Sequence, residues 1–255
     1  MIAGAMVDTH CHLGLCEPPA GELVAAARSA GVRRMLTVGL DEETNREAVA
    51  LAWEHEEVRA CVGRHPNSAA GFDDSAGAAI AELAADERVA AIGETGLDYY
   101  RDGAPRGDQR RAFEAQVEIA ASVGKPLVIH MRDSLEDTFE VLRASADGVT
   151  VILHCFSGPP EAVAEAADRG WLCSFAGNLT YPSAGELRDA ARLVPDELVL
   201  VETDSPFLAP QPRRGRPNQP ANVVHTARVL ADVRGLAYEG VEELVEANAA
   251  RVFRW

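Results

Sequence analysis

Six side chains of the kinds that bind metal ions lie where short apolar segments of the chain end. His10 and His12 follow the first segment as a His-x-His pair, so in an extended backbone both imidazoles project to one side while Cys11 points away. Glu94 follows the fourth segment in the stretch GETGLDYY. The other three residues are His130 in PLVIH, His154 in VILHC and Asp204 in LVLVETDSP, at the fifth, sixth and eighth segments.

Four imidazoles and two carboxylates are more ligands than one tetrahedral ion needs, but they suit two divalent ions that share a bridging carboxylate. Glu94 is the expected bridge because it is central in the strand order. Two ions about 3.5–4 Å apart can lower the pKa of a shared water and stabilise the attacking and leaving oxygens in phosphoester hydrolysis. The ligand set therefore predicts hydrolysis without a protein nucleophile.

Each of these histidines alone would fit an ordinary core or strand-end residue. Their joint occurrence at the same end of successive segments favours a metal site, because independent core histidines have no reason to choose that end. His55 lies in an acidic helical stretch and His225 near the start of the last helical block, so we interpret both as non-catalytic. Cys16 has no base at a fixed spacing and Cys155 should point away from its neighbouring ligand, so neither is expected to act as a ligand or nucleophile.

The elements that must position these residues form a regular alternation of short apolar and longer helix-forming segments. The predicted strands are 6–8, 34–38, 59–63, 89–93, 126–129, 150–153, 171–175 and 198–202. The predicted helices are 21–30, 42–56, 76–85, 108–123, 134–146, 160–168, 183–193 and a last block from 222 onward that includes 238–252. Such alternation indicates parallel strands joined by right-handed crossovers, and eight units favour a closed (β/α)8 TIM barrel of the metallo-dependent hydrolase type. The active site would lie at the carboxyl ends of the strands.

At 255 residues the chain matches one α/β barrel, so residues 1–255 are predicted to form a single domain. No apolar run approaches the roughly 18 residues of a membrane-spanning helix, and the first six residues lack the charged start of a signal peptide. Five scattered cysteines are typical of reduced thiols. We therefore expect a cytoplasmic protein without disulfides or a membrane partner.

The formal net charge of −16 argues against tight, non-specific binding to nucleic acid, because phosphate backbones are bound by neutralising them with Lys and Arg. A catalytic site in which metal ions supply the positive charge stays possible. The one dense basic stretch, Arg213, Arg214 and Arg216, falls in an irregular segment, 206–220, after the eighth strand. This segment is predicted to be a functional loop, and its arginines fit either a local substrate contact or a solvated surface.

Several motifs of the chain resemble those of the TatD family of metal-dependent hydrolases, in the same order and along nearly the whole chain. They read VDTHCH, GRHP, GETGLDYY, DQRRAFEAQVEIA, KPLVIHMRD, HCFSG, SFAGNLTYP, ETDSPFLAP and NAARVF. The resemblance implies a barrel deoxyribonuclease, or a broader phosphoesterase, that depends on two divalent ions such as Mg²⁺, Mn²⁺ or Zn²⁺. Its partner would be DNA in short or single-stranded pieces, with no obligate protein partner.

The resemblance also implies roles for individual residues. The residues that would hold the first ion are His10, His12, Glu94 and Asp204. Those that would hold the second are Glu94, His130 and His154. Asp204 would take a proton from the attacking water, which makes it the catalytic residue together with Glu94. The implied substrate contacts are His65, at the scissile phosphate, and Asn178, Tyr99 and Arg101. Arg132 would either contact a phosphate as well or pair with acidic groups near Asp133.

The chain departs from the family pattern in the loop RRGRPNQP. Pro217 stands where relatives usually have a second basic residue, and Gln219 stands where they have a Glu. These changes spare the predicted metal ligands and affect only expected contacts with the substrate.

Three other functions fit the same residues. An amidohydrolase acting on a C–N bond also begins with His-x-His, but the version bridged by a carboxylated Lys on the fourth strand is excluded, because the only lysine, Lys125, precedes the fifth strand. Hydrolysis of a carboxyl ester, such as an aminoacyl ester of tRNA, stays open because a metal pair does not itself choose phosphorus over carbon. A non-catalytic binding protein of the same fold is disfavoured, because all six ligands are present.

Overall fold

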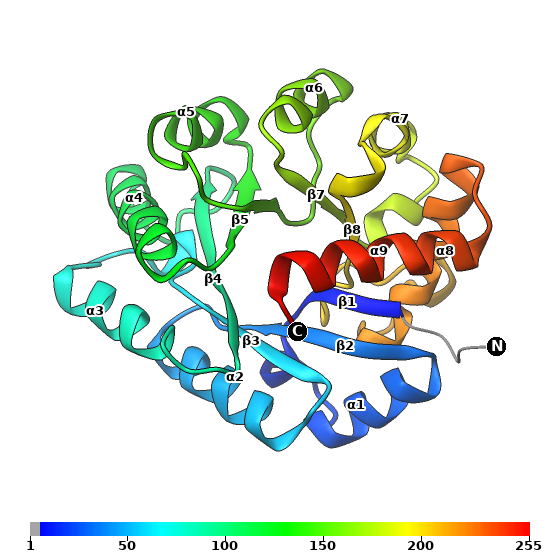
Figure 1. Ribbon diagram of the computed structural model, residues 1–255, viewed down its shortest axis with the longest axis horizontal. Helices are drawn as coiled ribbons and strands as arrows, with labels where there is room; N and C mark the ends of the chain where they lie inside the picture. Colours follow the sequence, from blue (N-terminus) through cyan, green and yellow to red (C-terminus); the bar gives the residue numbers. More distant parts are fainter. Residues whose placement is uncertain (1–5) are drawn as a thin grey trace.

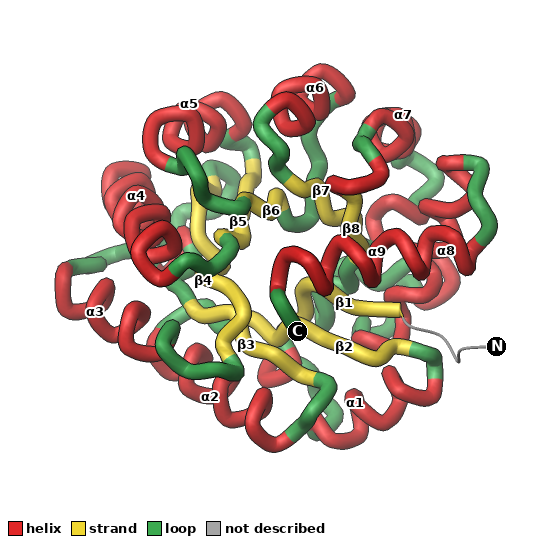
Figure 2. Tube along the Cα trace, in the orientation of Figure 1, coloured by secondary structure: helices red, strands yellow, loops and turns green. Residues whose placement is uncertain are grey.

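The computed structural model describes residues 6–255, so residues 1–5, which belong to the expected domain and to the stretch compared with a signal peptide, lie outside the described part. Eight parallel strands form one sheet in the order in which they occur along the chain. They are β1 (Met6–Cys11), β2 (Val32–Val38), β3 (Val58–Val62), β4 (Val89–Asp98), β5 (Leu127–Arg132), β6 (Val151–Leu153), β7 (Leu172–Phe175) and β8 (Val199–Val201). Helices surround the ring of strands (Figures 1 and 2), which confirms the predicted (β/α)8 TIM barrel.

Seven α-helices connect consecutive strands, and two more follow β8. They are α1 (Ala20–Ser29), α2 (Glu42–Glu54), α3 (Asp74–Leu83), α4 (Arg106–Val123), α5 (Leu135–Ser145), α6 (Pro160–Asp168), α7 (Gly185–Leu193), α8 (Val223–Arg234) and α9 (Tyr238–Phe253). Short 3-10 turns lie in the connections: η1 (Leu13–Leu15), η2 (Pro66–Ser68), η3 (Gly177–Thr180), η4 (Asp196–Leu198), η5 (Gln211–Arg213) and η6 (Pro220–Asn222). The last two helices pack against β1 and β8 and so cover the join of the barrel (Figure 1).

Some helix ends carry local signals that fix where the helix starts or stops. At the start of α2, the Asp41 side chain accepts a hydrogen bond from the Thr44 amide, and the Thr44 side chain interacts with the Asp41 backbone. This capping box satisfies amide groups that the helix itself leaves without partners. The helices α4 and α8 end at Gly124 (φ 64°) and Gly235 (φ 67°), where glycine adopts the left-handed conformation without a steric cost.

The core lies between the strands and the inner faces of the helices. Every residue of β1 and β4 is buried. Helix α4 presents Ala112, Phe113, Val117 and Ala120 to β4, an apolar stripe at helical spacing. Burying a side chain such as Phe113 contributes about 1.5–3 kcal/mol relative to leaving it exposed, so this packing holds β4 firmly against the outer layer.

The barrel is joined between β1 and the segment after β8. A parallel bridge links Cys11 with Ser205, and the His12 amide donates to the Ser205 carbonyl at 2.8 Å. The Asp204 amide donates to the His10 carbonyl at 2.9 Å. This pairing brings Asp204 beside the His-x-His pair.

The fourth and fifth strands extend further than the sequence predicted. The strand β4 continues to Asp98 instead of ending at 93, and β5 continues to Arg132 instead of ending at 129. In the extended region Gly96 pairs with His130 and Asp98 with Arg132. The predicted ends were placed at the last apolar residue, but sheet hydrogen bonds involve the backbone and continue past polar side chains. Glu94 and His130 therefore lie within strands and not after them.

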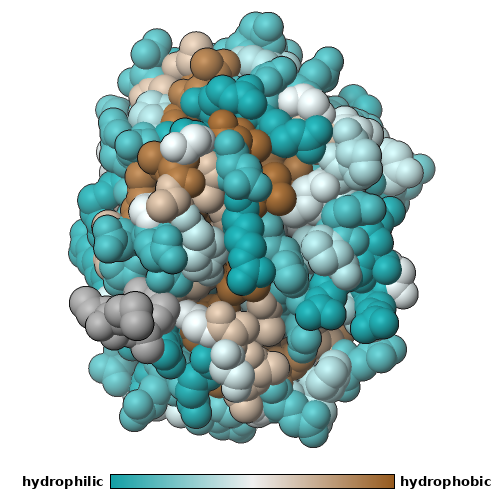
Figure 3. Space-filling view, turned by 90° about the vertical axis from the view of Figure 1, so that its right-hand side faces the viewer, coloured by the Kyte–Doolittle hydropathy of each residue, from teal (hydrophilic) through white to brown (hydrophobic). Residues whose placement is uncertain are grey.

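The surface mixes hydrophilic and hydrophobic residues. On the face seen in Figure 3, which is the right-hand side of Figure 1, hydrophobic patches are interrupted by hydrophilic side chains. Within residues 6–255 no helix combines the length and the apolar character needed to cross a membrane. The thiols of all five cysteines are free.

Candidate metal centre

All six predicted ligands meet at the carboxyl end of the barrel. His10 lies in β1, Glu94 in β4 and His130 in β5, while His12, His154 and Asp204 follow β1, β6 and β8 closely. Their donor atoms form sets in which every atom lies within 4.8 Å of the others. The sets are His10, His12 and Asp204; His10, Glu94 and His154; and His65, Glu94 and His130. Residues up to 194 positions apart in the sequence thus share one centre.

Glu94 lies between two groups of imidazoles, and each of its carboxylate oxygens faces one group. Oε2 is 3.4 Å from His10 Nε2 and 3.8 Å from His12 Nε2. Oε1 is 2.6 Å from His130 Nδ1 and 3.0 Å from His154 Nε2. A carboxylate with its two oxygens directed at separate donor groups is suited to bridge two cations.

Asp204 completes the group on the His-x-His side. Its Oδ1 atom is 3.5 Å from His12 Nε2 and 3.9 Å from His10 Nε2, and these two nitrogens are 3.3 Å apart. The side chain of Asp204 is 15% exposed, against 3% for Glu94. Asp204 is therefore the carboxylate of the centre that solvent reaches.

Hydrogen bonds on the far side of three rings orient the imidazoles toward the centre. His12 Nδ1 donates to the Val38 carbonyl at 2.9 Å, and His154 Nδ1 donates to Glu202 Oε1 at 2.9 Å. His130 Nε2 donates to Asp98 Oδ2 at 3.2 Å. Because an oxygen acceptor holds the proton on one ring nitrogen, the lone pair of the other nitrogen is directed at the shared centre. Histidines that bind metals are oriented in this way, so the donor set fits divalent ions.

The electrostatics of the centre favour added positive charge. Burial lowers the pKa of His154, but the negative charges of Glu202 and Glu94 outweigh burial and raise that pKa well above its usual value. Burial would raise the pKa of Glu94, yet the positive charge at His154 holds it well below its usual range. Glu94 is therefore ionised, and a cation bound here competes with protons for the imidazole nitrogens.

His65 differs from the three anchored histidines in the group that it presents to the centre. Its Nδ1 accepts a hydrogen bond from the Asn67 amide at 3.0 Å, so Nε2 carries the proton. Nε2 lies 3.6 Å from Glu94 Oε1. Burial lowers the pKa of His65 to about 3, so the ring is neutral at pH 7. His65 thus offers a hydrogen-bond donor to the centre, whereas the other three anchored rings offer lone pairs.

Two carboxylates that the sequence reasoning missed support the ligands. Glu202 is fully buried and holds His154, and Asp98 holds His130 while also accepting hydrogen bonds from the Tyr100 and Arg101 amides at 3.0 Å each. A signal for Asp98 was present, because it lies four residues after Glu94 and so faces the same side of an extended strand. Glu202 stands two residues before Asp204 in the ETDSP motif.

The proposed substrate contacts are distributed over different parts of the surface. The predicted ligands open onto a cavity of about 270 Å³ whose lining includes His65, Arg101 and Arg132. Asn178 does not line this cavity; it lies in η3, and its buried Oδ1 has no hydrogen-bond partner within the described residues. The structure therefore brings His65 and Arg101 to the centre but not Asn178.

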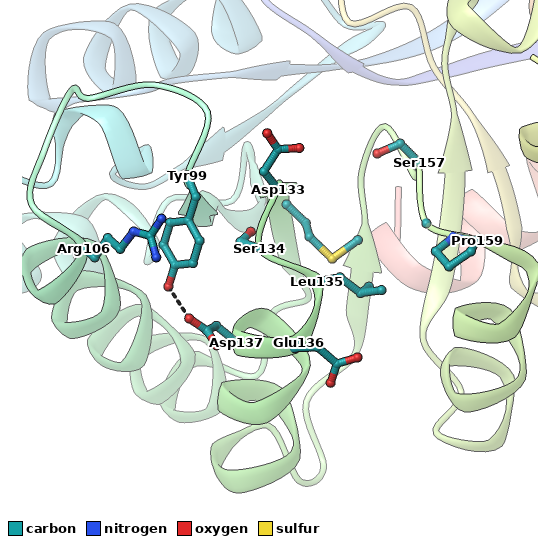
Figure 4. A pocket seen from close by; sticks show the side chains of 11 residues that line it. Tyr99, Arg106, Asp133, Ser134, Leu135, Glu136, Asp137, Ser157 and Pro159 are labelled. Carbon is teal, nitrogen blue, oxygen red and sulfur yellow. Dashed lines mark hydrogen bonds between the residues drawn. The ribbon is translucent and has the colours of Figure 1, made fainter. Parts of the chain in front are cut away.

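Tyr99 lines a neighbouring cavity of about 540 Å³ (Figure 4). Its hydroxyl donates to Asp137 Oδ2 at 2.6 Å, and the Arg106 guanidinium lies 3.7 Å from the centre of its ring. Both contacts are visible in Figure 4, and Tyr99 does not line the cavity of the predicted ligands. Of Tyr99 and Arg101, only Arg101 therefore lines the cavity of the predicted ligands, although both line a third cavity beside it.

Lys125 bears on the amidohydrolase alternative. Its ammonium group donates to the Ala84 and Val89 carbonyls, before and at the start of β4. It is therefore held at the opposite end of the barrel from Glu94, as predicted.

Comparison with known proteins agrees with this geometry. Residues 7–254 match the family model described as TatD related DNase. The chain belongs to the TatD family. It is 40% identical to the uncharacterized metal-dependent hydrolase TatD of Mycobacterium tuberculosis, with 97% of each chain covered. It is 34% identical to a Cronobacter sakazakii protein named 3'-5' ssDNA/RNA exonuclease TatD, over 91% of this chain and 90% of the relative. The crystal structure of YjjV, a TatD homologue from Escherichia coli, superposes with a TM-score of 0.91 at 25% identity and covers 98% of both chains.

Family membership confirms the resemblance of the motifs. The protein is a metal-dependent hydrolase of the TatD family, an enzyme of the class that acts on ester bonds. Its cluster of His, Glu and Asp side chains supplies the metal-binding groups that this chemistry requires.

Proposed function

We propose that this enzyme hydrolyses phosphodiester bonds in single-stranded DNA, with two divalent metal ions at the carboxyl end of the barrel. The observation that carries the proposal is the placement of Glu94, whose two oxygens face separate groups of imidazoles. His10, His12, Asp204 and Glu94 would hold one ion, and Glu94, His130 and His154 the other. With four imidazoles in the donor set, we expect Zn²⁺ or Mn²⁺ in at least one position and leave Mg²⁺ as the alternative for the other.

The residues of the centre divide the chemistry between them. Two divalent ions bound here would lower the pKa of an attacking water and stabilise the leaving oxygen. Asp204 accepts the proton of that water, because it is the carboxylate that solvent reaches. His65 donates a hydrogen bond from Nε2 to an oxygen of the scissile phosphate, since its neutral ring offers a donor to the cavity. The site needs no protein nucleophile.

Charge supports a short or single-stranded substrate. A chain with a net charge of −16 cannot neutralise the many phosphates of a long duplex. The cavity nevertheless offers two guanidinium groups, Arg101 and Arg132, beside the ligands. These guanidinium groups can form ion pairs with one or two phosphates next to the cleaved bond. The exonuclease name of the Cronobacter relative agrees with this substrate class.

The same proposal places the enzyme in the cytoplasm and requires no protein partner. Five free thiols suit a reducing compartment.

The proposal is tested by hydrolysis of single-stranded and duplex DNA oligomers with metal-stripped protein, to which Mg²⁺, Mn²⁺ or Zn²⁺ is added back separately. We expect metal-restored release of nucleotides from single strands, faster than from duplex. A p-nitrophenyl acetate control runs in parallel. Restored cleavage of this ester with DNA left intact would move the substrate to carboxyl esters on the same barrel.

Two variants test the ligand assignment. His130→Ala and Asp204→Ala should each abolish turnover and leave the fold intact, because each removes a group of the centre while the strands remain packed. His225→Ala is the matched control, since this histidine lies in α8, outside the cavity lining. Full activity of either ligand variant would rule out the two-ion mechanism.

A further inference from the structure

A large apolar ring stands at the entrance of the metal centre. Phe207 lies three residues after Asp204, is 50% exposed and lines the same cavity as the ligands. Its ring meets the His12 ring edge to face, with 6.1 Å between the centroids. Of the exposed large hydrophobic side chains in the described part of the chain, Phe207 is the one in this lining.

The backbone holds this ring in a defined place. The Phe207 amide donates to the Asp204 carbonyl at 2.8 Å, and the Asn218 side-chain amide donates to the Phe207 carbonyl at 2.7 Å. The same Asn218 nitrogen also donates to the Thr203 carbonyl at 2.9 Å, and Asn218 is itself buried. Hydrogen bonds thus link the Phe207 backbone to Asp204 and to the buried Asn218. The ring is therefore exposed at a fixed position.

The cavity is chemically asymmetric. Phe207, after β8, and Leu40, after β2, give it apolar surface on the side of His12. Arg101 and Arg132 line it from the loop after β4 and the end of β5, which lie half a barrel away in the strand order. The Arg132 guanidinium is oriented by the Tyr100 ring, 3.9 Å from its centroid. A ligand that carries a flat apolar group and an anion would match both sides of this cavity.

We propose that Phe207 is a substrate-binding residue that stacks on the nucleobase next to the phosphodiester bond being cleaved. This inference rests on the proposed nuclease function and specifies how the substrate is held. A nucleotide joins an aromatic face to a phosphate, which matches the asymmetry of the cavity. Aromatic rings stack on every base because each base has a π face, so the contact favours nucleic acid without selecting its sequence. A base stacked on Phe207 has left its duplex stack, which gives the preference for single strands a structural cause.

The first test compares Phe207→Ala with Phe207→Tyr, which keeps the aromatic face. The control is Leu236→Ala, which removes an exposed apolar side chain between α8 and α9. The substrates are single-stranded oligomers that are fully natural or carry a tetrahydrofuran abasic residue at one position at a time. Phe207→Ala should lower kcat/KM on the natural oligomer about 10- to 100-fold, mainly through KM, as expected for a lost base stack. Phe207→Tyr and Leu236→Ala should stay near the wild type.

The abasic series separates stacking from a structural role. If Phe207 stacks on a base, an abasic residue at one position should lower kcat/KM of the wild type about as much as Phe207→Ala does on the natural oligomer. On that abasic oligomer, kcat/KM of Phe207→Ala should be little lower than on the natural one. Equal losses for Phe207→Ala on all oligomers, or no loss on any, would overturn the proposal. Failure of the wild-type enzyme to cleave any oligomer with any metal would instead overturn the nuclease function on which it rests.

A spectroscopic measurement gives an independent answer. A single-stranded oligomer with 2-aminopurine at the position identified by the abasic series should lose fluorescence on binding to the wild-type holoenzyme, because stacking quenches this base. The quenching should be lost with Phe207→Ala and kept with Leu236→Ala. Unchanged quenching in Phe207→Ala would assign the stack to another side chain and refute the proposal.

Discussion

Replacing Glu202 with glutamine tests whether a buried charge behind His154 determines the metal affinity of one half of the centre. Glu202 is 0% exposed, and its Oε1 accepts both the His154 Nδ1 proton at 2.9 Å and the Cys155 amide at 2.8 Å. Its other oxygen has no hydrogen-bond partner within the described residues. Glutamine keeps an acceptor oxygen for both bonds but removes the negative charge that makes the His154 ring a stronger donor to a cation.

The expected magnitude follows from this arrangement. Loss of an outer hydrogen-bond partner of a metal-binding histidine lowers metal affinity about 10- to 100-fold, which is about 1.4–2.7 kcal/mol. We expect the upper part of this range for Glu202→Gln, because the carboxylate is fully buried and solvent screens its charge little. The loss should fall mainly on the ion that His154 would help to hold, because His154 Nε2 lies 3.0 Å from Glu94 Oε1.

The assay is calorimetric titration of metal-stripped protein with Mn²⁺ or Zn²⁺. The wild type should bind two ions, and the variant should bind one of them with reduced affinity. Glu118→Gln is the matched control, because it makes the same chemical change at an exposed position of α4. Equal affinities of Glu202→Gln and the wild type for both ions would refute the role assigned to the buried charge, provided that their circular dichroism spectra agree.

Two further predictions concern how the fold positions the site. Gly96→Ala should reduce metal binding and destabilise the fold, because Gly96 has φ 138° and an added Cβ would lie 2.1 Å from the His130 carbonyl oxygen. Calorimetric titration measures the metal binding, and thermal unfolding measures the stability. Wild-type values in both measurements would contradict this prediction. Asp41→Ala should lower the free energy of unfolding by about 1 kcal/mol through loss of the α2 cap, while Asp41→Asn should retain the cap at neutral pH. Burial would raise the pKa of Asp41, but hydrogen bonds from Thr44 lower that pKa below 3.8. The charge of Asp41 therefore stabilises the fold above this pH. In urea denaturation, the difference in unfolding free energy between Asp41→Asn and the wild type should shrink, and should not grow, as the pH falls below this value.

The sequence supported the ligand set because chemistry and periodicity agree at these positions. His10 and His12 stand two residues apart in a strand, so their common side follows from backbone geometry alone. Asp204 is different, since its place beside His10 depends on the join between β1 and the segment after β8. That join could be expected only after eight strand–helix units had been recognised as a closed barrel.

The residues that sequence reasoning left out depend on register, which no local pattern fixes. Asp98 meets His130 only because β4 continues past its apolar part and pairs with β5 after an irregularity between Ile92 and Thr95. Tyr99 and Arg101 stand two residues apart, yet only Arg101 lines the cavity of the predicted ligands, because the chain turns after Asp98. Phe207 was visible in the motif ETDSPFLAP, but its exposure beside His12 is a property of the folded loop.

An acidic chain can bind the proposed anionic substrate, because the phosphate needs positive charge only at the metal centre. Glu94 and Asp204 face the centre directly, and Asp98 and Glu202 stand behind His130 and His154. Four carboxylates around four imidazoles leave an excess of negative charge in a buried volume, which favours divalent cations over protons on the rings. Once such cations are present, the phosphate is attracted to the centre itself and not to a basic surface. Specificity can then come from the apolar side of the cavity, where Phe207 distinguishes an aromatic base from the acyl group of a carboxyl ester.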